Sequence, residues 1–532
     1  GYALLKWEDG SQAATRSFKM PDANVAAAAH FGPTASIPLP TVKSPGAVRL
    51  TVGVTATQAL EIASESLASV TVSGLPGGLR YDAAAQAVIG VPRVPVSDRA
   101  VTVKVRNAGG ASVSTYRMTV EALPQWAQGS FNGTVDAGGV ATLTVSAAGK
   151  VTGKIACRGT NYTFSAASYA SGDGESGFAI AATAKAGQAT LPLALTVLPA
   201  PESGAASLGV AAGMLDGALP LAAYRNVWKD ADAAALLTPF VGYYTAALAG
   251  GAEYGSGYLT FTLDKAGKVK AAGKLADGTA VSQSGTLILD ETGRLLMAIY
   301  AAPSGYKGGS LFGLAELVKP DAGDVYLRPL DGAAFLWSSR NPAATEAYGA
   351  GFDRSLLLAG GWYSKTENLA AYYEGLVLAA STDAEAPAPE LAVGSARTAS
   401  AWWSPAGVAL TPAVNAAGVM TGLAAPAAGK PTDEDGDGVW DYSAPNASGL
   451  KISLVRPTGI FKGSFLCWFD YPEKKHVSKK VSFEGALTPV RENPADGAEG
   501  RGFFLWADAG AVPATGKAYA FSWSYDFLLL GE

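Results

Sequence analysis

The stretch ATLTVSAAGKVTGKIAC, from Ala141 to Cys157, decides the fold class. An alternating strand is followed by a glycine turn and by a second strand that carries another glycine. The pattern recurs as YLTFTLDKAGKVKAAGKL, from Tyr258 to Leu275, and as LKISLVRPTGIFKGSFLC, from Leu450 to Cys467. An internal repeat of short strands predicts an all-β chain of tandem small antiparallel barrels or bent sheets. It gives little sign of an active site.

Each copy has one apolar and one polar strand face, and successive side chains of a strand point to opposite faces. The residues expected to point inward are Leu143, Val145, Leu259, Phe261, Leu263, Leu450, Ile452 and Leu454. The residues expected to face water are Thr142, Thr144, Thr260, Thr262, Lys451 and Ser453. The turn glycines Gly149, Gly267 and Gly459 are expected to adopt positive φ. The return-strand glycines Gly153, Gly273 and Gly463 suggest a bulge or a barrel corner.

The third copy lies further from the second than the second lies from the first, which predicts an insertion within residues 380–443. The two cysteines, Cys157 and Cys467, occupy the same strand position in copies one and three. Equivalent positions in separate modules rarely approach within disulfide distance, so we expect two small buried thiols. The predicted domains are residues 1–31, 37–122, 123–235, 236–380 and 381–532.

The composition narrows the function classes. The 532 residues carry a net charge of −5 with a pI near 5.4, and only 16% of them are charged. Nucleic-acid binding is disfavoured because it needs a dense basic surface. The one basic cluster, Lys474, Lys475, His476, Lys479 and Lys480, is interpreted as a solvated hairpin tip, with an anionic partner site as the alternative.

No apolar run is long enough for a membrane span, and residues 1–31 lack a signal-peptide pattern. Because the chain begins with Gly1 rather than Met, we expect it to be a piece of a longer protein. The expected partners are therefore neighbouring modules of that longer chain, and a glycan or a surface protein is a further possibility.

Residues 1–31 contain WEDG, TRSF and MPDANV, with Trp7 and Phe31 near the two ends. They resemble the closing half of an internalin-type B repeat, a β-grasp-like module of bacterial surface proteins. Residues 37–122 contain SGLPGGLRYDAAAQAVIGVP, from Ser73 to Pro92, and VTVKVRNAGGASVSTYRMTV, from Val101 to Val120. They resemble the immunoglobulin-like, cadherin-like domains of bacterial surface proteins, which implies a β-sandwich of this length.

The three-copy pattern resembles repeat regions of large secreted proteins from the Planctomycetes–Verrucomicrobia–Lentisphaerae group. The resemblance implies an extracellular or cell-surface location and no defined activity. We therefore expect a non-catalytic structural or adhesive region of a large bacterial surface protein. Two alternatives stay open: a carbohydrate-binding surface module, and an accessory region of a secreted glycosidase or protease.

The sharpest local motif is DEDGDGVWD, in which Asp433, Asp435, Asp437 and Asp441 stand at positions one, three, five and nine of a calcium-type loop. Val439 stands at position seven and completes the candidate ligand set. The glutamate of a helix–loop–helix site is missing at position twelve, and the motif resembles the loops of dockerin-like and thrombospondin-type-3 segments. We expect a structural Ca²⁺ site, against the alternative of a solvated acidic turn.

Signatures of catalysis are scarce. The chain has two histidines, His30 and His476, and no nucleophile elbow, HExxH motif or phosphate-binding glycine loop. A carboxylate pair for glycoside hydrolysis has no spacing rule and stays open. The aromatic clusters Trp362-Tyr363, Trp402-Trp403 and Trp523-Tyr525 favour core packing, with sugar stacking as the alternative. Trp402 and Trp403 are the preferred candidates for a ligand platform.

Overall fold

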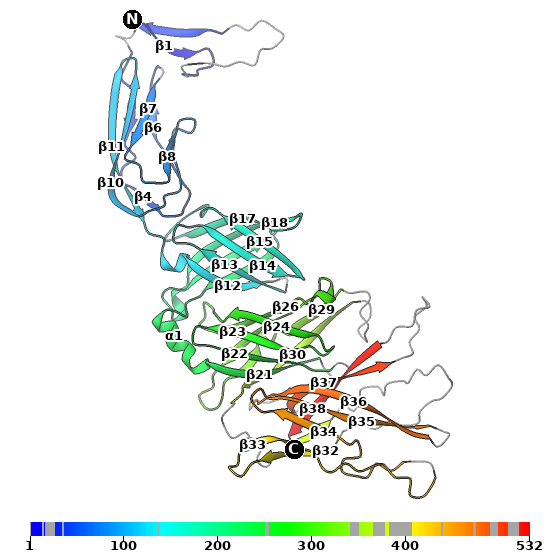
Figure 1. The fold of residues 1–532 in the computed structure, drawn as a ribbon. Helices are drawn as coiled ribbons and strands as arrows, with labels where there is room; N and C mark the ends of the chain where they lie inside the picture. Colours follow the sequence, from blue (N-terminus) through cyan, green and yellow to red (C-terminus); the bar gives the residue numbers. More distant parts are fainter. Residues whose placement is uncertain are drawn as a thin grey trace, which may run out of the picture.

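The computed structural model describes residues 2–12, 15, 27–33, 37–66, 68–136, 138–250, 255–340, 351–364, 378–381, 407–437, 440–471, 475–489, 498–508 and 521–531. The predicted all-β class is confirmed, since 59% of the described residues are in strands and these residues contain one short α-helix, α1 (Ala231–Leu237). Figure 1 shows the modules following one another in chain order from the N-terminus to the C-terminus.

The N-terminal part consists of a hairpin and a sandwich. The hairpin pairs β1 (Tyr2–Trp7) with β2 (Ala29–Pro33). The main sandwich sheet has the order β4-β11-β10-β7, in which β4 runs parallel to β11. Its strands are β4 (Val48–Thr51), β7 (Ser69–Ser73), β10 (Val96–Asn107) and β11 (Gly110–Glu121). Opposite it lie β3 (Thr41–Lys43) with β6 (Glu61–Ala63), and β5 (Ala56–Ala59) with β9 (Ala87–Gly90) and β8 (Leu79–Asp82).

Alternation predicts the sandwich core correctly. The side chains of Val101, Val103, Val105 and Met118 are almost fully buried. They pack in one cluster with Val88 of the opposite sheet. The sequence-based expectation of an immunoglobulin-like sandwich agrees with this two-sheet arrangement.

Barrel 1 is a closed eight-stranded meander. Its strands are β12 (Gly129–Val135), β13 (Gly139–Val145), β14 (Val151–Cys157), β15 (Thr160–Ala166), β17 (Gly177–Ala186), β18 (Ala189–Pro199), β19 (Gly209–Leu215) and β20 (Leu219–Arg225), with the short β16 (Ser171–Asp173) beside β17. Each pairs with the next along the chain, and β20 returns to β12. The pair Thr163–Lys185, between β15 and β17, closes the ring. Closure leaves no long edge exposed.

Barrel 2 repeats this meander but leaves one seam without a ladder. Its strands are β21 (Gly242–Ala249), β22 (Gly257–Leu263), β23 (Lys268–Lys274), β24 (Ala280–Thr286), β25 (Ile288–Leu289), β26 (Leu295–Ala301), β27 (Leu311–Val318), β28 (Tyr326–Pro329), β29 (Phe335–Ser339) and β30 (Phe352–Trp362). The sheet runs from β24 through β21 and β30 to β25.

A side chain spans the seam between β24 and β26. The amide of Gln283 donates to the carbonyl of Ala298 at 2.7 Å and accepts from the backbone N–H of Tyr300 at 2.6 Å. One glutamine thus supplies both the donor and the acceptor that a neighbouring strand would offer.

Barrel 3 has the strand order β33-β32-β31-β38-β37-β36-β35-β34. The strands are β31 (Leu378–Ser381), β32 (Val408–Val414), β33 (Met420–Ala424), β34 (Lys451–Val455), β35 (Ile460–Tyr471), β36 (Lys475–Leu487), β37 (Ala498–Asp508) and β38 (Phe521–Gly531). The region predicted to be an insertion therefore contributes β31, β32 and β33 to the sheet. Among the described residues of this region, those that follow β33 carry Asp433, Asp435, Asp437 and Asp441.

The strand faces and turns of the repeated pattern agree with the predictions in two respects. The residues expected to point inward are buried, apart from Ile452, which is partly buried. The turn glycines Gly149, Gly267 and Gly459 have φ of +76°, +70° and +67°.

Of the two alternatives predicted for the return-strand glycines, a bulge or a barrel corner, the bulge is wrong. The registers of β13–β14, β22–β23 and β34–β35 run without a shift through Gly153, Gly273 and Gly463. A Cβ on Gly153 would lie 2.2 Å from the ring of Phe164, and one on Gly463 would lie 2.5 Å from the ring of Phe483. At these two positions glycine makes room for an aromatic ring in the core.

Barrel 3 contains an equivalent of the first repeat that the sequence-based prediction misses. In barrels 1 and 2 the hairpin closes through a residue whose N–H binds the carbonyl four positions on: Ser146 with Lys150, and Asp264 with Lys268. Asn415 makes the same bond to Val419, in the hairpin between β32 and β33. The turn at Gly459 is different, because its N–H binds the carbonyl of Val455. Barrel 3 therefore contains a further copy of the turn, NAAGVMTG at residues 415–422, which matches SAAGKVTG at 146–153. The predicted copy at Gly459 keeps another feature of the repeat, because its carbonyl accepts from the N–H of Leu487 as the carbonyl of Gly267 accepts from the N–H of Leu287.

Both cysteines are buried and unbonded, as predicted. Burial raises the pKa of the Cys157 thiol, and it raises the pKa of the Cys467 thiol to about 12.

We expect Gln283→Leu to destabilise barrel 2 by about 1–3 kcal/mol, because it leaves a part-buried backbone donor and a part-buried backbone acceptor without the Gln283 side chain. Ser284→Leu, which places the same side chain at an exposed position of the same strand, is the control. Chemical denaturation followed by circular dichroism measures both. Equal stability of the two variants would contradict the role of Gln283 in closing the seam.

Candidate functional site

The acidic loop lies between β33 and β34, and the bridge between Thr432 and Asp441 closes its base. Carboxylate oxygens of Asp433, Asp435 and Asp437 lie within 4.8 Å of one another. The backbone N–H of Asp437 donates to Asp435 at 3.3 Å, which folds the loop back on itself. Three convergent carboxylates are the donor set that a hard divalent cation prefers.

Two predicted ligands of this loop stand apart from that cluster. Asp441 accepts a hydrogen bond from the backbone N–H of Ser443 at 2.9 Å, and it is not one of the three convergent residues. Val439 lies outside the described residues. The fit to a cation therefore rests on Asp433, Asp435 and Asp437.

The preferred aromatic platform, Trp402 with Trp403, also lies outside the described residues. Of the other pairs, Tyr363 is buried in the core of barrel 3, and Trp362 packs partly buried against the core of barrel 2. Core packing is thus confirmed for that pair. Trp523 and Tyr525 belong to β38.

The basic cluster lies mainly on a strand and not in a loop. Lys475, His476, Lys479 and Lys480 belong to β36, in the hairpin that β35 and β36 form. Lys479 and Lys480 are exposed, as predicted. Lys474 lies outside the described residues.

The junctions between modules form the most organised polar and apolar contacts outside the cores. At the first junction the sandwich adds a short parallel bridge to barrel 1, between Val54 and Tyr169. The N–H of Thr55 donates to Tyr169 at 3.0 Å, and the N–H of Tyr169 donates to Gly53 at 2.9 Å. The Val54 side chain is buried within the core cluster of barrel 1. A sandwich residue thus completes the core of the next module.

At the second junction the segment that leaves barrel 1 closes the core of barrel 2. Val227, Trp228, Ala233 and Leu237 all belong to the barrel 2 core cluster. The indole N–H of Trp228 donates to the carbonyl of Leu287 at 2.7 Å. A connection that sequence alone would treat as a linker is therefore part of the packed interior.

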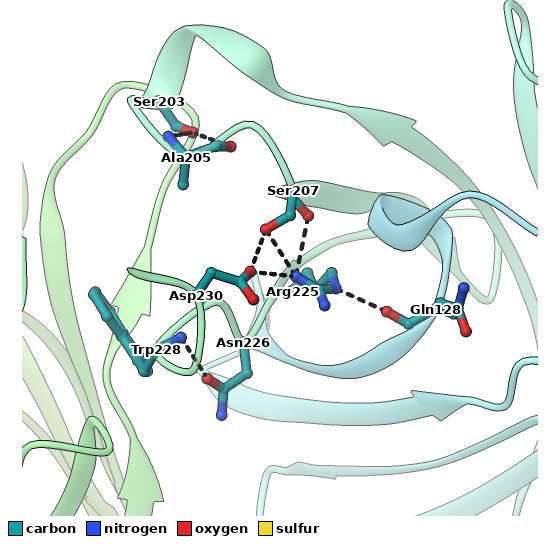
Figure 2. A network of polar contacts seen from close by, with 8 residues as sticks. All are labelled: Gln128, Ser203, Ala205, Ser207, Arg225, Asn226, Trp228 and Asp230. Atoms are coloured by element: carbon teal, nitrogen blue, oxygen red, sulfur yellow. Dashed lines mark hydrogen bonds and ion pairs between the residues drawn. The ribbon is translucent and has the colours of Figure 1, made fainter. Parts of the chain in front are cut away.

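A polar network anchors the start of the same segment to barrel 1 (Figure 2). Arg225, at the end of β20, donates to the Gln128 carbonyl at 2.9 Å, the Ser207 hydroxyl at 3.0 Å and the Asp230 carboxylate at 3.0 Å. The hydroxyl of Ser207 also donates to Asp230. A serine and an aspartate in contact could suggest a nucleophile, but no histidine takes part and Arg225 neutralises the carboxylate. The network fits an anchor for the segment that precedes α1.

The third junction joins barrels 2 and 3 by similar means. Tyr363 follows β30, is buried in the core of barrel 3, and donates its hydroxyl proton to the Arg456 carbonyl at 2.6 Å. The Tyr243 hydroxyl of barrel 2 donates to Thr458 at 3.0 Å. Tyr258 of barrel 2 also packs in a small apolar cluster with Ala486 and Phe503 of barrel 3.

Charged groups also meet at this junction: one pair is partly exposed and the other is largely buried. Glu484 of barrel 3 accepts from Lys274 at 2.6 Å and from the Tyr258 hydroxyl at 3.2 Å. Burial, and then the nearby carboxylate, raises the pKa of Tyr258. The Asp526 carboxylate accepts from the Ser256 N–H at 2.9 Å and lies 3.6 Å from Arg501. Burial lowers the pKa of Arg501, and Asp526 opposes that shift.

At each of the three junctions, the preceding segment touches a glycine of a hairpin turn in the next barrel. A Cβ added to Gly149 would lie 2.4 Å from the Cα of Gly53. A Cβ on Gly267 would lie 2.1 Å from the ring of Trp228, and one on Gly459 would lie 2.8 Å from the ring of Tyr363. The sequence predicts the conformation of these glycines, but it does not show that they receive a neighbouring module.

Comparisons with known proteins give no family. No protein-family model matches the chain, and no curated protein matches it in sequence. A crystal structure from Bacteroides fragilis NCTC 9343, described as a "putative alpha-galactosidase", is 22% identical over 17% of this chain and 19% of its own, with a TM-score of 0.15. A quinonprotein alcohol dehydrogenase-like protein from Bacteroides thetaiotaomicron VPI-5482 is 10% identical over 61% of this chain and 99% of its own, also with a TM-score of 0.15. The chain thus spans about a fifth of the first of these proteins.

None of the described helices is long and apolar enough to cross a membrane.

We expect Gly267→Ala to destabilise the chain by about 2–4 kcal/mol. About 1 kcal/mol comes from the left-handed backbone, and the rest comes from displacing Trp228. Gly217→Ala is the matched control, because Gly217 has φ of +65° and nothing within 4 Å of an added Cβ. Thermal unfolding of the two variants measures the difference. Equal losses would show that the contact with Trp228 contributes nothing.

Proposed function

We propose that this chain is a non-catalytic scaffold region of a large secreted or cell-surface bacterial protein, which holds attached modules at a fixed distance and orientation. The observation that carries the proposal is the insertion of one module into the core of the next. Val54 enters barrel 1, Trp228 enters barrel 2 and Tyr363 enters barrel 3.

Such junctions differ from ordinary domain connections. Modules joined by exposed polar linkers reorient freely, and interfaces between domains are usually small and polar. Here each connection removes an aromatic or branched side chain from water, and burial of one such side chain is worth about 1.5–3 kcal/mol. Bending a junction would expose that side chain again, so the junctions favour one orientation.

Resemblances in the sequence support the proposed location of the scaffold. The sandwich region and the N-terminal hairpin resemble modules of bacterial surface proteins, and this resemblance supports the surface location and an adhesive or display role. The neighbouring modules of a longer chain would then be the principal partners.

Small-angle X-ray scattering of the whole chain tests the stiffness. We expect the wild type to fit one extended particle. Val54→Asp, which places a charge in the barrel 1 core, should broaden the distribution of distances because the sandwich no longer docks. Val113→Asp is the control, since Val113 is 60% exposed on the same sandwich. A wild type that already scatters as freely jointed modules would overturn the proposal.

We further propose that the acidic loop binds one structural Ca²⁺. The support is the convergence of the Asp433, Asp435 and Asp437 carboxylates within 4.8 Å. These three residues would hold the ion, and the ion would offset the repulsion among them. Because the loop connects β33 to β34, its ordering would brace the point where the first three strands of barrel 3 meet the last five.

Calorimetric titration with CaCl₂ tests this site. We expect the wild type to bind one Ca²⁺, and Asp435→Asn to weaken binding at least tenfold. Glu434→Gln removes the same charge from the same loop at a residue outside the three-aspartate cluster, and it should bind almost as the wild type does. Absence of binding heat in the wild type, together with an unchanged melting temperature on adding Ca²⁺, would exclude the site.

A further inference from the structure

A groove of about 390 Å³ lies where barrel 1 meets barrel 2. Barrel 1 contributes Gly138 and Arg158, which lie in two of its hairpin turns. Barrel 2 contributes β27, β29 and β30, with the residues that flank them. Ligand sites occur preferentially at such boundaries between domains, and the volume falls within the usual range for small-molecule sites.

The charge of the groove is opposite to that of the chain. Among the described residues, three arginines, Arg158, Arg340 and Arg354, line it together with one carboxylate, Asp353. The chain as a whole has a net charge of −5. A local excess of guanidinium groups between two low-dielectric walls attracts anions.

The arginines are held in different ways. Arg340 donates to Asp353 at 2.7 Å, and also to the backbone carbonyls of Ser339 and Phe352, so its position is fixed. Arg158 is exposed in the turn between β14 and β15, with φ of +49°. Within the described part of the chain, no carboxylate lies within ion-pair distance of Arg158. Arg158 is therefore the guanidinium most available to a ligand.

Docking of the two barrels fixes Arg158 relative to the rest of the groove. The N–H of the next residue, Gly159, donates to the Tyr300 hydroxyl of barrel 2 at 3.1 Å. Backbone packs on backbone here, since a Cβ on Gly159 would lie 2.5 Å from the Cα of Gly308. The groove is thus formed before any ligand arrives, which lowers the entropic cost of binding.

The groove also offers apolar and hydroxyl groups beside its charges. Phe312 and Leu336 lie directly opposite each other on β27 and β29, and Leu336 is 52% exposed. Ser310, Ser338 and Ser355 line the same groove. A ligand that matches all of these groups is an anion carried on a ring with one apolar face and several hydroxyls.

We propose that this groove binds an anionic sugar residue, one that bears a carboxylate or a sulfate on a pyranose ring. Arginine recognises both anions through paired N–H donors. The serines would bond the sugar hydroxyls, and Phe312 would pack against the apolar face of the ring. An acidic peptide fits less well, because β29 is paired on both sides, with β27 and β30, and offers no backbone edge. The proposal does not depend on the scaffold role.

The test is calorimetric titration of the whole chain with an oligogalacturonate, with a chondroitin sulfate oligosaccharide and with a neutral galacto-oligosaccharide. We expect at least one anionic sugar to bind, more weakly as salt is added, and the neutral sugar not to bind. Arg158→Gln should weaken binding about tenfold, the factor for loss of one charge-assisted bond. Arg117→Gln, which removes an exposed arginine of the sandwich, is the control and should bind as the wild type does.

Several results would overturn the proposal. They are absence of binding by both anionic sugars, equal binding of the neutral sugar, and unchanged affinity in Arg158→Gln. Equal affinity for inorganic sulfate alone, or tighter binding of an oligoglutamate peptide, would exclude a sugar as the ligand. The melting temperature of each variant shows that a loss of binding is not a loss of folding.

Discussion

Close approach of one module to a hairpin turn of the next is the contact on which the arrangement of this chain depends. A turn glycine with positive φ presents backbone where any other residue would present a Cβ. At Gly149 and Gly267 that Cβ would lie within 2.5 Å of the preceding module. Because these glycines have no Cβ, the preceding segment comes close enough for Val54 to enter the core of barrel 1 and for Trp228 to enter the core of barrel 2. The packing of each core therefore depends on the glycine in the turn beside it.

One consequence is that the barrels share their stability. A core completed by a residue from the preceding module is not fully formed until that module docks. The charges at the third junction also make the stability of one barrel depend on the other. The Asp526 carboxylate of barrel 3 is compensated by Arg501 and by the N–H of Ser256 in barrel 2. Separation of barrels 2 and 3 would take away one of these partners and leave a buried carboxylate less well compensated. We therefore infer that the junctions resist both bending and separation.

The sequence predicts local features well and contacts between modules poorly. Period-2 alternation places Leu143 and Phe261 inward because it follows from strand geometry alone. The aspartate spacing of the acidic loop is equally local, and three of its carboxylates converge. The sequence-based prediction misses the further copy at Asn415, because the glycine turn at Gly459 also fits the pattern and only the hydrogen bond from Asn415 to Val419 reveals the other turn. Nothing near Trp228 in the sequence shows that it closes the core of barrel 2, since its partner Leu287 is distant along the chain.

The arrangement also locates where binding chemistry can arise. Small β-barrels fill their interiors with side chains, and here Phe131, Phe261 and Phe461 are each almost fully buried in the cores of barrels 1, 2 and 3. A ligand must then meet outer faces, loops or junctions. At the junction of barrels 1 and 2, the glycine contacts that fix the barrels also bring Arg158 beside Arg340 and Arg354. Arg158 lies far in sequence from Arg340 and Arg354, so its charge adds to theirs only when barrel 1 docks on barrel 2.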